Sequence, residues 1–185
     1  MNLTRLLDAE SETLSLTDVK DQLRITATDD DDALRMFIAG IRHRTEQFLC
    51  KTLVTSTWEL KLDCFAPVIE LPMYPIQSIT SIAYVDTDGA SQTLSSSLYQ
   101  FDKGGRLLPA YGQTWPSTRS QLDAVTVTYV AGKTHAGNVE PDIKLAMLLW
   151  IGACDLNREN IAFTQVSTIP DGAQSLLAQH RNWKL

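Results

Sequence analysis

The sequence predicts an α+β protein in which helices from both ends of the chain form a bundle around an inserted, antiparallel β-rich lobe. Apolar residues recur with the 3.6-residue period of helices towards both ends, and with the two-residue period of strands between them. Asp-Gly and Gly-Gly turn signals divide the middle of the chain, as in antiparallel strands joined by hairpins. We therefore expect an N-terminal helical segment at 1–54, a β-rich lobe at 55–131 and a C-terminal helical segment at 132–185, packed as one compact unit.

Two helices are predicted in the first segment. Ser15 and Asp18 have the Ser-x-x-acid spacing of a capping box, in which each side chain bonds an amide of the first turn, so we expect a short helix over residues 15–25. The run from Asp29 to Asp32 places acidic groups at the positive end of a helix dipole. Apolar residues at helical spacing follow that run, and they predict a second helix over about residues 30–51.

Strand signals begin after Thr52. Trp58, Leu60 and Leu62 alternate with charged residues, which is typical of a half-buried strand. Turn residues separate this strand from further strand-like segments. These segments are Ser81–Asp86, Leu98–Asp102, Arg106–Pro109 and Leu122–Val130.

A strongly apolar helix is predicted in the last segment. Pro141 suits a first helical turn, and the helix is expected to continue through 142–157. Its centre, Leu145 to Ile151, is apolar on almost every side, so it must be buried either within the fold or against a neighbouring subunit. A loop at Thr164–Pro170 then leads to a short helix with one apolar stripe. The stripe consists of Ala173, Leu176, Leu177 and His180.

Length and composition indicate a soluble globular protein. The chain has 185 residues, of which 44% are hydrophobic and 21% charged, and a net charge of −6. The longest apolar run, Leu145–Cys154, is shorter than the roughly 20 residues that a membrane span needs. No secretory signal is recognised, so we expect a cytoplasmic origin. The three cysteines are widely spaced, form neither a disulfide framework nor a paired metal site, and are expected to be buried.

Motifs for catalysis, metals and cofactors are incomplete. Gly132-Lys133-Thr134 lacks the earlier glycine of a phosphate loop, because that position is Val127. Asp86 to Gly89 resembles the centre of a calcium loop, but the closing glutamate position is Ser95, so a hairpin turn is the better interpretation. The three histidines have no spacing that favours a nucleophile–base pair or a metal site. We therefore expect no enzyme activity, no metal site and no cofactor.

Several segments, in this order, resemble the head–tail connector, or adaptor, proteins of long-tailed bacteriophages and prophages. Together they span about residues 14–183, and their order and spacing carry the resemblance. The segments are Leu16–Ile25 with the Asp-rich helix start, Leu71–Ile79, Ile82–Gly89, Gly105–Leu107 with Trp115-Pro116, Val125–Gly132, Glu140–Ala146 with Asn157–Glu159, and Pro170 followed by Leu176-Leu177 and Arg181.

The resemblance implies a structural virion protein that is made in the bacterial cytoplasm and located at the head–tail junction. Proteins of this family form a ring of about a dozen copies beneath the portal of the DNA-filled head, extend the DNA channel and offer a platform for tail-side proteins. The implied partners are other copies of the chain, the portal protein and a tail-side stopper or tail-completion protein. DNA would pass through the channel without sequence-specific binding, and no membrane is involved.

Two groups of residues are candidates for contacts in such a ring. We expect Asp29, Asp30, Asp31 and Asp32 to line the channel or its rim, where acidic side chains would let DNA phosphates slide. The alternative is that the net charge of −6 serves only solubility. We expect a tail, Thr164–Leu185, to order on the portal. Its docking residues would be Leu176, Leu177, Arg181 and Trp183.

Two other functions remain open from the residues. One is a stopper or tail-terminator ring subunit, which would lie further from the portal. The other is a small hydrolase or sugar-binding module, with Trp58, Tyr111 and Trp115 as an exposed aromatic platform. Burial of these aromatic side chains in strands and loops is the simpler explanation of their positions.

Overall fold

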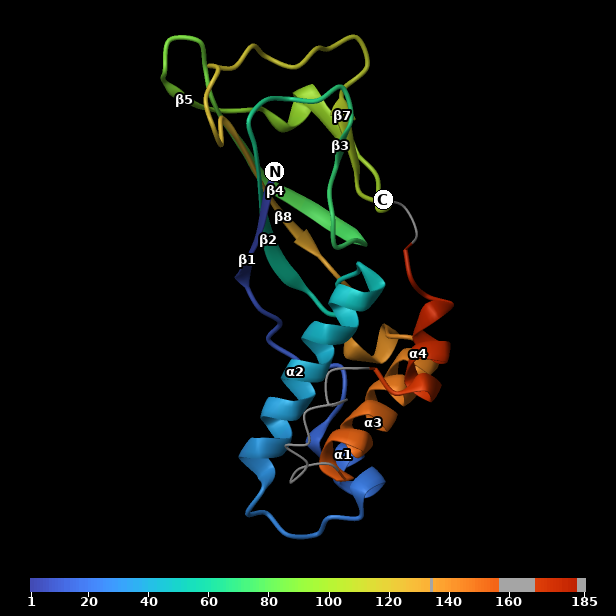
Figure 1. The fold of residues 1–185 in the computed structure, drawn as a ribbon. Coiled ribbons are helices and arrows are strands. Elements are labelled where there is room, and N and C mark those ends of the chain that lie inside the picture. The colour runs from blue at the N-terminus through green and yellow to red at the C-terminus, as the bar shows by residue number, and fades with distance from the viewer. Residues whose placement is uncertain (134, 157–168, 183–185) are drawn as a thin grey trace. The chain divides into compact units, whose positions relative to one another are not determined.

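The computed structural model describes residues 1–133, 135–156 and 169–182. Within these residues it contains helices and antiparallel sheets, which confirms the α+β class (Figure 1). The helices are α1 (Leu16–Leu23), α2 (Asp31–Leu49), α3 (Pro141–Leu156) and α4 (Asp171–Ala178). The strands are β1 (Asn2–Leu7), β2 (Ser56–Leu62), β3 (Ile69–Glu70), β4 (Ile76–Val85), β5 (Ser91–Thr93), β6 (Tyr99–Phe101), β7 (Arg106–Pro109) and β8 (Val125–Ala131).

The chain divides into two compact units. The β unit comprises Met1–Glu10 and Thr55–Lys133, and the helical unit comprises Ser11–Val54 and Thr134–Leu185. This division differs from the single compact unit expected from the sequence. It also differs from the expected boundaries, because the first ten residues join the β unit and not the N-terminal helical segment.

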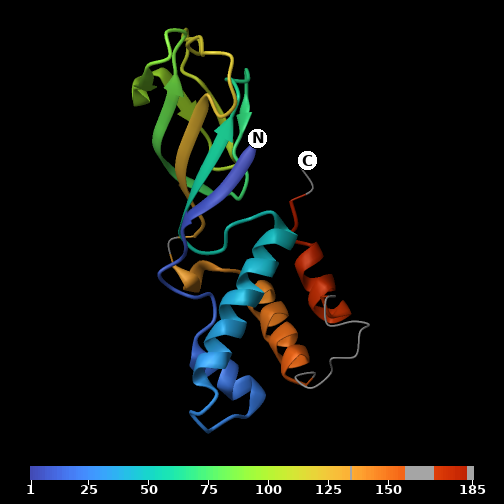
Figure 2. The same cartoon turned by 60° about the vertical axis from the view of Figure 1, so that its left-hand side comes forward.

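The larger sheet of the β unit has the strand order β1-β2-β8-β4-β5 (Figure 2). Its centre is β8, which pairs with β2 on one side and with β4 on the other, so that Val127 lies opposite both Leu60 and Ile82. These three side chains are fully buried, which explains the alternation that predicted β2 and β8. A smaller sheet, in the order β3-β7-β6, contributes Ile69 and Leu107 to the same core.

Two contacts fasten the segment after β3 to this core. The Leu71 amide donates a hydrogen bond of 2.6 Å to the Gly105 carbonyl, and Gly105 has a φ of +96°, which an L side chain rarely adopts. The Tyr129 hydroxyl on β8 donates to the Pro72 carbonyl at 2.7 Å. Burial raises the pKa of Tyr129 far above its ordinary value, so this hydroxyl remains a donor. The two bonds together hold residues 71–72 against both sheets.

β1 was not predicted from the sequence. It pairs antiparallel with β2, and the register shifts between Arg5 and Leu7. This irregularity breaks the two-residue alternation of side chains, which is why the segment gives only a weak strand signal. The Arg5 guanidinium lies 4.5 Å from the ring centre of Trp58, so a cation–π contact also joins the two strands.

The turn at Asp86 confirms the hairpin interpretation of Asp86 to Gly89. β4 and β5 pair across it, and Gly89 has a φ of +90°. The Asp86 carboxylate accepts hydrogen bonds from the Gln92 side chain and from the amides of Asp88 and Ala90. The bond from Gln92, followed by that from Ala90, holds the pKa of Asp86 below its usual range. The Asp86 carboxylate therefore stabilises the hairpin turn through hydrogen bonds to residues of the hairpin itself.

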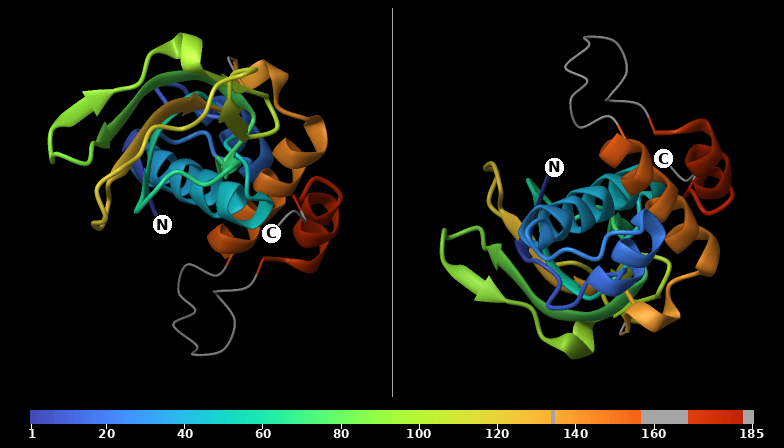
Figure 3. Two further views of the ribbon diagram at one scale, coloured as in Figure 1. Left: turned by 90° about the horizontal axis from the view of Figure 1, so that it is seen from above. Right: turned by 90° about the horizontal axis from the view of Figure 1, so that it is seen from below.

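In the helical unit, α3 lies between α2 and α4, and α1 packs on α2 and α3 (Figures 2 and 3). The predicted capping box is present: the Asp18 amide donates to Ser15 Oγ, and the Ser15 amide donates to Asp18 Oδ2, each at 3.1 Å. Val19 is buried on the inner face of α1. The last predicted helix is also confirmed as α4, in which Ala173 and Leu177 are buried.

α3 has one buried face and one exposed face. Ile143, Met147, Trp150 and other residues at helical spacing are buried within the unit. On the opposite side Leu145, Leu149 and Leu156 are 47%, 39% and 87% exposed. The surplus of apolar residues that the sequence shows is therefore not absorbed by the chain's own core.

Candidate functional site

An ion-pair network fixes the loop that precedes α1. Arg42 of α2 is fully buried, and its guanidinium donates to both carboxylate oxygens of Glu12, at 2.8 Å and 3.2 Å. It also contacts the buried Glu46 carboxylate at 3.4 Å. Glu46 in turn accepts the Leu53 amide at 2.8 Å. One guanidinium thereby ties the loop at Glu12 to α2 and to the segment that follows α2.

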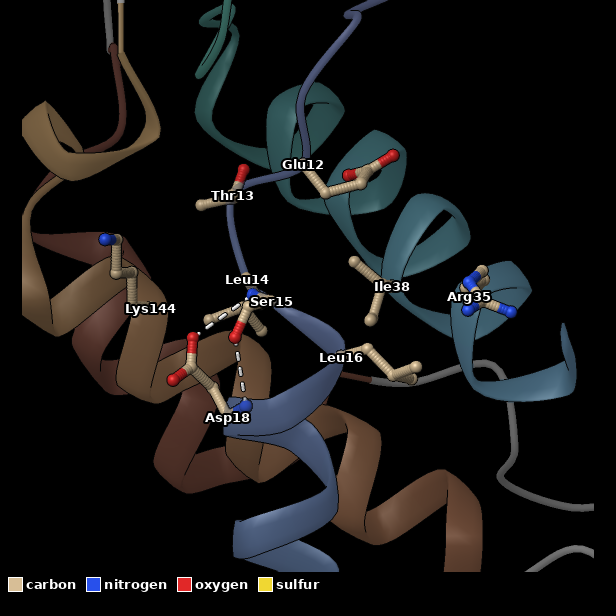
Figure 4. A pocket seen from close by; sticks show the side chains of 9 residues that line it. All are labelled: Glu12, Thr13, Leu14, Ser15, Leu16, Asp18, Arg35, Ile38 and Lys144. Carbon is tan, nitrogen blue, oxygen red and sulfur yellow. Dashed lines mark hydrogen bonds between the residues drawn. The ribbon is translucent and has the colours of Figure 1, made fainter. Parts of the chain in front are cut away.

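This loop forms one wall of an open pocket of about 680 Å³ (Figure 4). Lys144 of α3 lies on one side of the pocket and Arg35 of α2 on the other. Leu14 and Ile38 are buried beneath it. The remaining lining residues are Glu12, Thr13, Ser15, Leu16 and Asp18.

The lining of this pocket is chemically mixed. Its lining combines apolar side chains with two basic and two acidic ones, and none of these described residues is a histidine or cysteine. Asp18 and Ser15 already serve the cap of α1, and the bond from Ser15 lowers the pKa of Asp18. Ser15 and Asp18 therefore have a structural role in the pocket wall.

The acidic run lies at the start of α2, as the sequence predicts. Asp29, Asp30 and Asp32 are exposed, whereas Asp31 is half-buried and forms an ion pair of 2.7 Å with Lys20 of α1. Asp32 pairs with Arg35 one turn later at 2.8 Å. The structure therefore brings these residues together, but it gives Asp31 a role inside the unit.

The candidate docking residues near the C-terminus are separated by burial. Leu177 is fully buried, Leu176 is half-buried, and Arg181 is half-buried with its guanidinium 5.1 Å from the ring centre of Phe48. Trp183 lies outside the described residues. The described part of the tail, residues 169–182, includes α4 packed on α3, so Leu177 serves the core of this unit.

Two outward faces of the helical unit are further candidates: the sequence had indicated that the helix carrying the first could contact a neighbouring subunit, whereas the second was missed. We call Leu145, Leu149 and Leu156 the α3 leucine face. We call Met36, Gly40 and Arg44, which follow one another at four-residue spacing on α2, the α2 glycine face. Met36 is 76% exposed, and a Cβ at Gly40 would meet nothing within 4 Å. Their spacing was visible in the sequence, but the choice between a core face and an exposed face was not.

The aromatic residues of the β unit do not form an exposed platform. Trp58 is buried, and Trp115 stacks on Phe65 with ring centres 4.8 Å apart. Tyr111 is fully exposed. Since the platform would need all three side chains at one surface, the sugar-binding interpretation loses the feature that suggested it.

Titratable and metal-ligating groups are dispersed over the described residues. His180 Nε2 lies 3.6 Å from Asp142 Oδ2, whereas His43 and His135 lie on α2 and in the loop after β8. In the described ranges, no three side chains of His, Cys, Asp or Glu are placed to hold a metal ion. The expectation that the cysteines are buried was wrong, because Cys64 is exposed and the other two are half-buried. No helix in the described part of the chain has the length and apolar character to cross a membrane.

Comparison with known proteins gives one family and one fold. Residues 13–102 match the family described as phage gp6-like head-tail connector protein, which confirms the resemblance found in the sequence. A chain in the neck of an empty gene transfer agent (GTA) particle, computed with C6 symmetry, has a TM-score of 0.80 at 18% identity. A chain of the native GTA virion has a TM-score of 0.80 at 19% identity, and one from the native GTA neck, computed with C12 symmetry, has 0.72 at 19% identity.

In each of these three comparisons the match covers 100% of this chain and 97% of the other. These likenesses show that the whole fold, including both units, is shared. No curated protein matches the chain.

Proposed function

We propose that the chain is a non-enzymatic structural protein of a virion, located at the junction of head and tail, because residues 13–102 match the family described as phage gp6-like head-tail connector protein. The observation that carries this proposal is the family match, which includes α1, α2 and the strands from β2 to β6. The fold shared with chains of GTA particles supports it over the full length. Such a protein would be made in the cytoplasm of the bacterial host.

The proposed assembly is a ring of copies of this chain beneath the portal. The similar chains come from necks computed with C6 and C12 symmetry, which supports a cyclic arrangement of about a dozen copies. In a cyclic ring each copy uses two different surfaces, one towards each neighbour. Below the portal, the ring would prolong the DNA channel and present a platform to a tail-side stopper or tail-completion protein.

The exposed acidic residues at the start of α2 are proposed to face the channel or its rim. Asp29, Asp30 and Asp32 add negative charge to a chain that already has a net charge of −6. DNA phosphates are repelled by such a surface, so DNA would slide past without being held. Asp31 is assigned to the ion pair with Lys20 in this proposal.

Portal contact is proposed for the half-buried residues of the C-terminal part, Leu176 and Arg181. Leu177 would support them from the core of the unit. Trp183 is kept as a candidate from the sequence alone. A stopper or tail terminator would instead bind further along the neck, so the first partner bound distinguishes these roles.

The test is binding to DNA-filled heads that carry a portal but lack their connector. We expect the purified chain to sediment with these heads and to add a ring of density below the portal in electron micrographs. Chains that bind only to heads already carrying a connector would indicate the stopper role. Failure to bind either kind of head would overturn the proposal.

Two sets of variants examine the assigned residues in the same assay. Leu176→Gln with Arg181→Gln should weaken binding to the portal, whereas the matched control Gln174→Leu, on the exposed side of α4, should leave it unchanged. Replacing Asp29, Asp30 and Asp32 by asparagine should slow the release of DNA from assembled heads. Unchanged release would leave these carboxylates with a role in solubility only.

A further inference from the structure

The α3 leucine face is an apolar surface without a cover in the described part of the chain. Leu145, Leu149 and Leu156 fall on one side of the helix, and together they span about three turns. The acidic residues Asp142 and Asp155 flank them. An aligned apolar surface with a polar border is typical of a protein contact, whereas single exposed apolar residues are common on any protein.

The α2 glycine face is suited to close approach by another helix. Glycine destabilises a helix interior relative to alanine, and nothing in the described part of the chain requires Gly40: its φ is not positive and a Cβ there would meet no atom within 4 Å. Met36, one turn earlier, is a large and adaptable apolar side chain that is exposed. The open space at Gly40 therefore lies one turn from an exposed apolar side chain, a combination that suits close packing of another helix.

The charges that border the two faces differ at the C-terminal half of α2. Arg44 is exposed on the α2 glycine face with His43 beside it, whereas Asp32, one turn before Met36, forms an ion pair with Arg35. Asp142, whose side chain is 58% exposed, and Asp155 border the α3 leucine face together with Lys144. A contact of the α3 leucine face with the Arg44 end of α2 would therefore bring acidic side chains towards a basic one, whereas a contact between two α3 leucine faces would bring acidic side chains together.

We propose that the α3 leucine face of one copy packs on the α2 glycine face of the next copy, with Leu149 seated over Gly40. The proposal rests on the ring proposed above, and it names the surfaces that build it. α2 and α3 each turn their buried side to the shared core of the helical unit, so the two faces point away from that core. An interface between two unlike surfaces repeats from copy to copy, as a closed ring requires.

The test is photo-cross-linking of the full chain. Benzoylphenylalanine is placed at position 36, which is 76% exposed, and the purified protein is irradiated at about 1 mM, where even an interface with a millimolar Kd is half formed. We expect a ladder of dimers, trimers and larger species on a denaturing gel. Mass spectrometry should find the adducts within residues 145–156 of another copy.

The matched control carries the same amino acid at Leu122, which is 80% exposed on the β unit, and should give no ladder. A second variant, Gly40→Leu, fills the space above Gly40, where a Cβ would meet no atom of the described residues within 4 Å, so it should remain folded and give at least tenfold less multimer. Absence of covalent multimers, adducts confined to dimers that join two α2 helices, or full ladders from Gly40→Leu would each overturn the proposal.

This result can be separated from the test of the proposed function. The ladder reports contact between copies and does not involve the portal. A chain that forms the ladder but fails to bind heads would contradict the connector role and retain the interface. A chain that binds heads without forming the ladder would support the connector role and contradict the proposed interface.

Discussion

The β unit and the helical unit bury different kinds of side chain. Among the described residues, the β unit buries an almost entirely apolar core, and its backbone groups form hydrogen bonds between neighbouring strands. The helical unit buries the charged Arg42 and Glu46 together with several threonines. It also exposes an aligned apolar surface on α3, whereas the exposed apolar residues of the β unit come from separate loops and strands.

The difference indicates a division of roles. A core of apolar side chains between sheets needs no partner from outside the unit, since neighbouring strands hydrogen-bond the backbone groups of one another. A buried ion-pair network contributes less to stability than to a defined arrangement, because both charges must be taken out of water. We interpret the β unit as the scaffold and the helical unit as the part whose geometry is specified for contact.

The largest expected effect comes from removing the buried guanidinium. Arg42→Met should lower the free energy of unfolding of the helical unit by about 3–5 kcal/mol, because the Glu46 carboxylate stays buried without this cation. Hydrogen exchange resolved by peptide should show lost protection in α1 and α2, with the β unit retained. Arg42→Met with Glu46→Gln should recover part of the loss, since Gln keeps an acceptor for the Leu53 amide. An equal loss of hydrogen-exchange protection in both units would contradict a network that stabilises the helical unit alone.

A substitution at Gly105 should destabilise the β unit. In Gly105→Ala the new Cβ would lie 2.5 Å from the Leu71 carbonyl oxygen at a φ of +96°, so we expect a loss of about 2–3 kcal/mol in urea unfolding. The control is Gly112→Ala, which has a φ of +74° but open space, and it should lose only about 1 kcal/mol. Similar losses in the two variants would show that the close approach to Leu71 is unimportant.

The cap of α1 adds a smaller, pH-dependent contribution to the helical unit. Ser15→Ala should lower the free energy of unfolding by about 1 kcal/mol at neutral pH, because the Asp18 amide loses its acceptor. The Ser15 side chain also lowers the pKa of Asp18, so its contribution is present above the ordinary Asp pKa and is lost as the pH falls through the lowered value. Denaturant unfolding should therefore show a smaller difference from wild type in acid. Thr17→Ala, at an exposed neighbouring position, serves as the control.

The smallest expected effect has the opposite sign. Gly40→Ala should raise the free energy of unfolding of the isolated chain by about 0.5–1 kcal/mol, because alanine favours a helix interior and its Cβ meets open space. Thermal unfolding at low protein concentration measures this change without contact between copies. A loss of stability would mean that Gly40 serves its own chain.

Local patterns predicted the elements whose signals lie within a few residues. The capping box of α1, the acidic start of α2 and the full extent of β7 were recognised from spacing alone. β1 was missed because its partner β2 is distant in the sequence and its register shifts between Arg5 and Leu7. β3 was missed because its two residues carry no readable period, and β5 because its three residues are all polar and exposed.

The candidate site depended still more on distant contacts. Glu12 and Arg42 are 30 residues apart, and neither residue type indicates such a pair from the sequence. Leu177 shows why a helical stripe is ambiguous: the period that suggested a docking surface belongs to the core that α4 forms with α3. On α3 the surplus of apolar residues was visible, but its exposed side is determined by where α1, α2 and α4 pack.

The interleaving of the two units along the chain has a consequence for protein synthesis. A chain that has emerged from the ribosome as far as Lys133 contains all the described strands of the β unit, and α1 and α2 of the helical unit, but neither α3 nor α4. Within one growing chain, Met36 and Gly40 therefore emerge before Leu145 and Leu149. Each growing chain would thus hold one of the two proposed contact faces well before it holds the other.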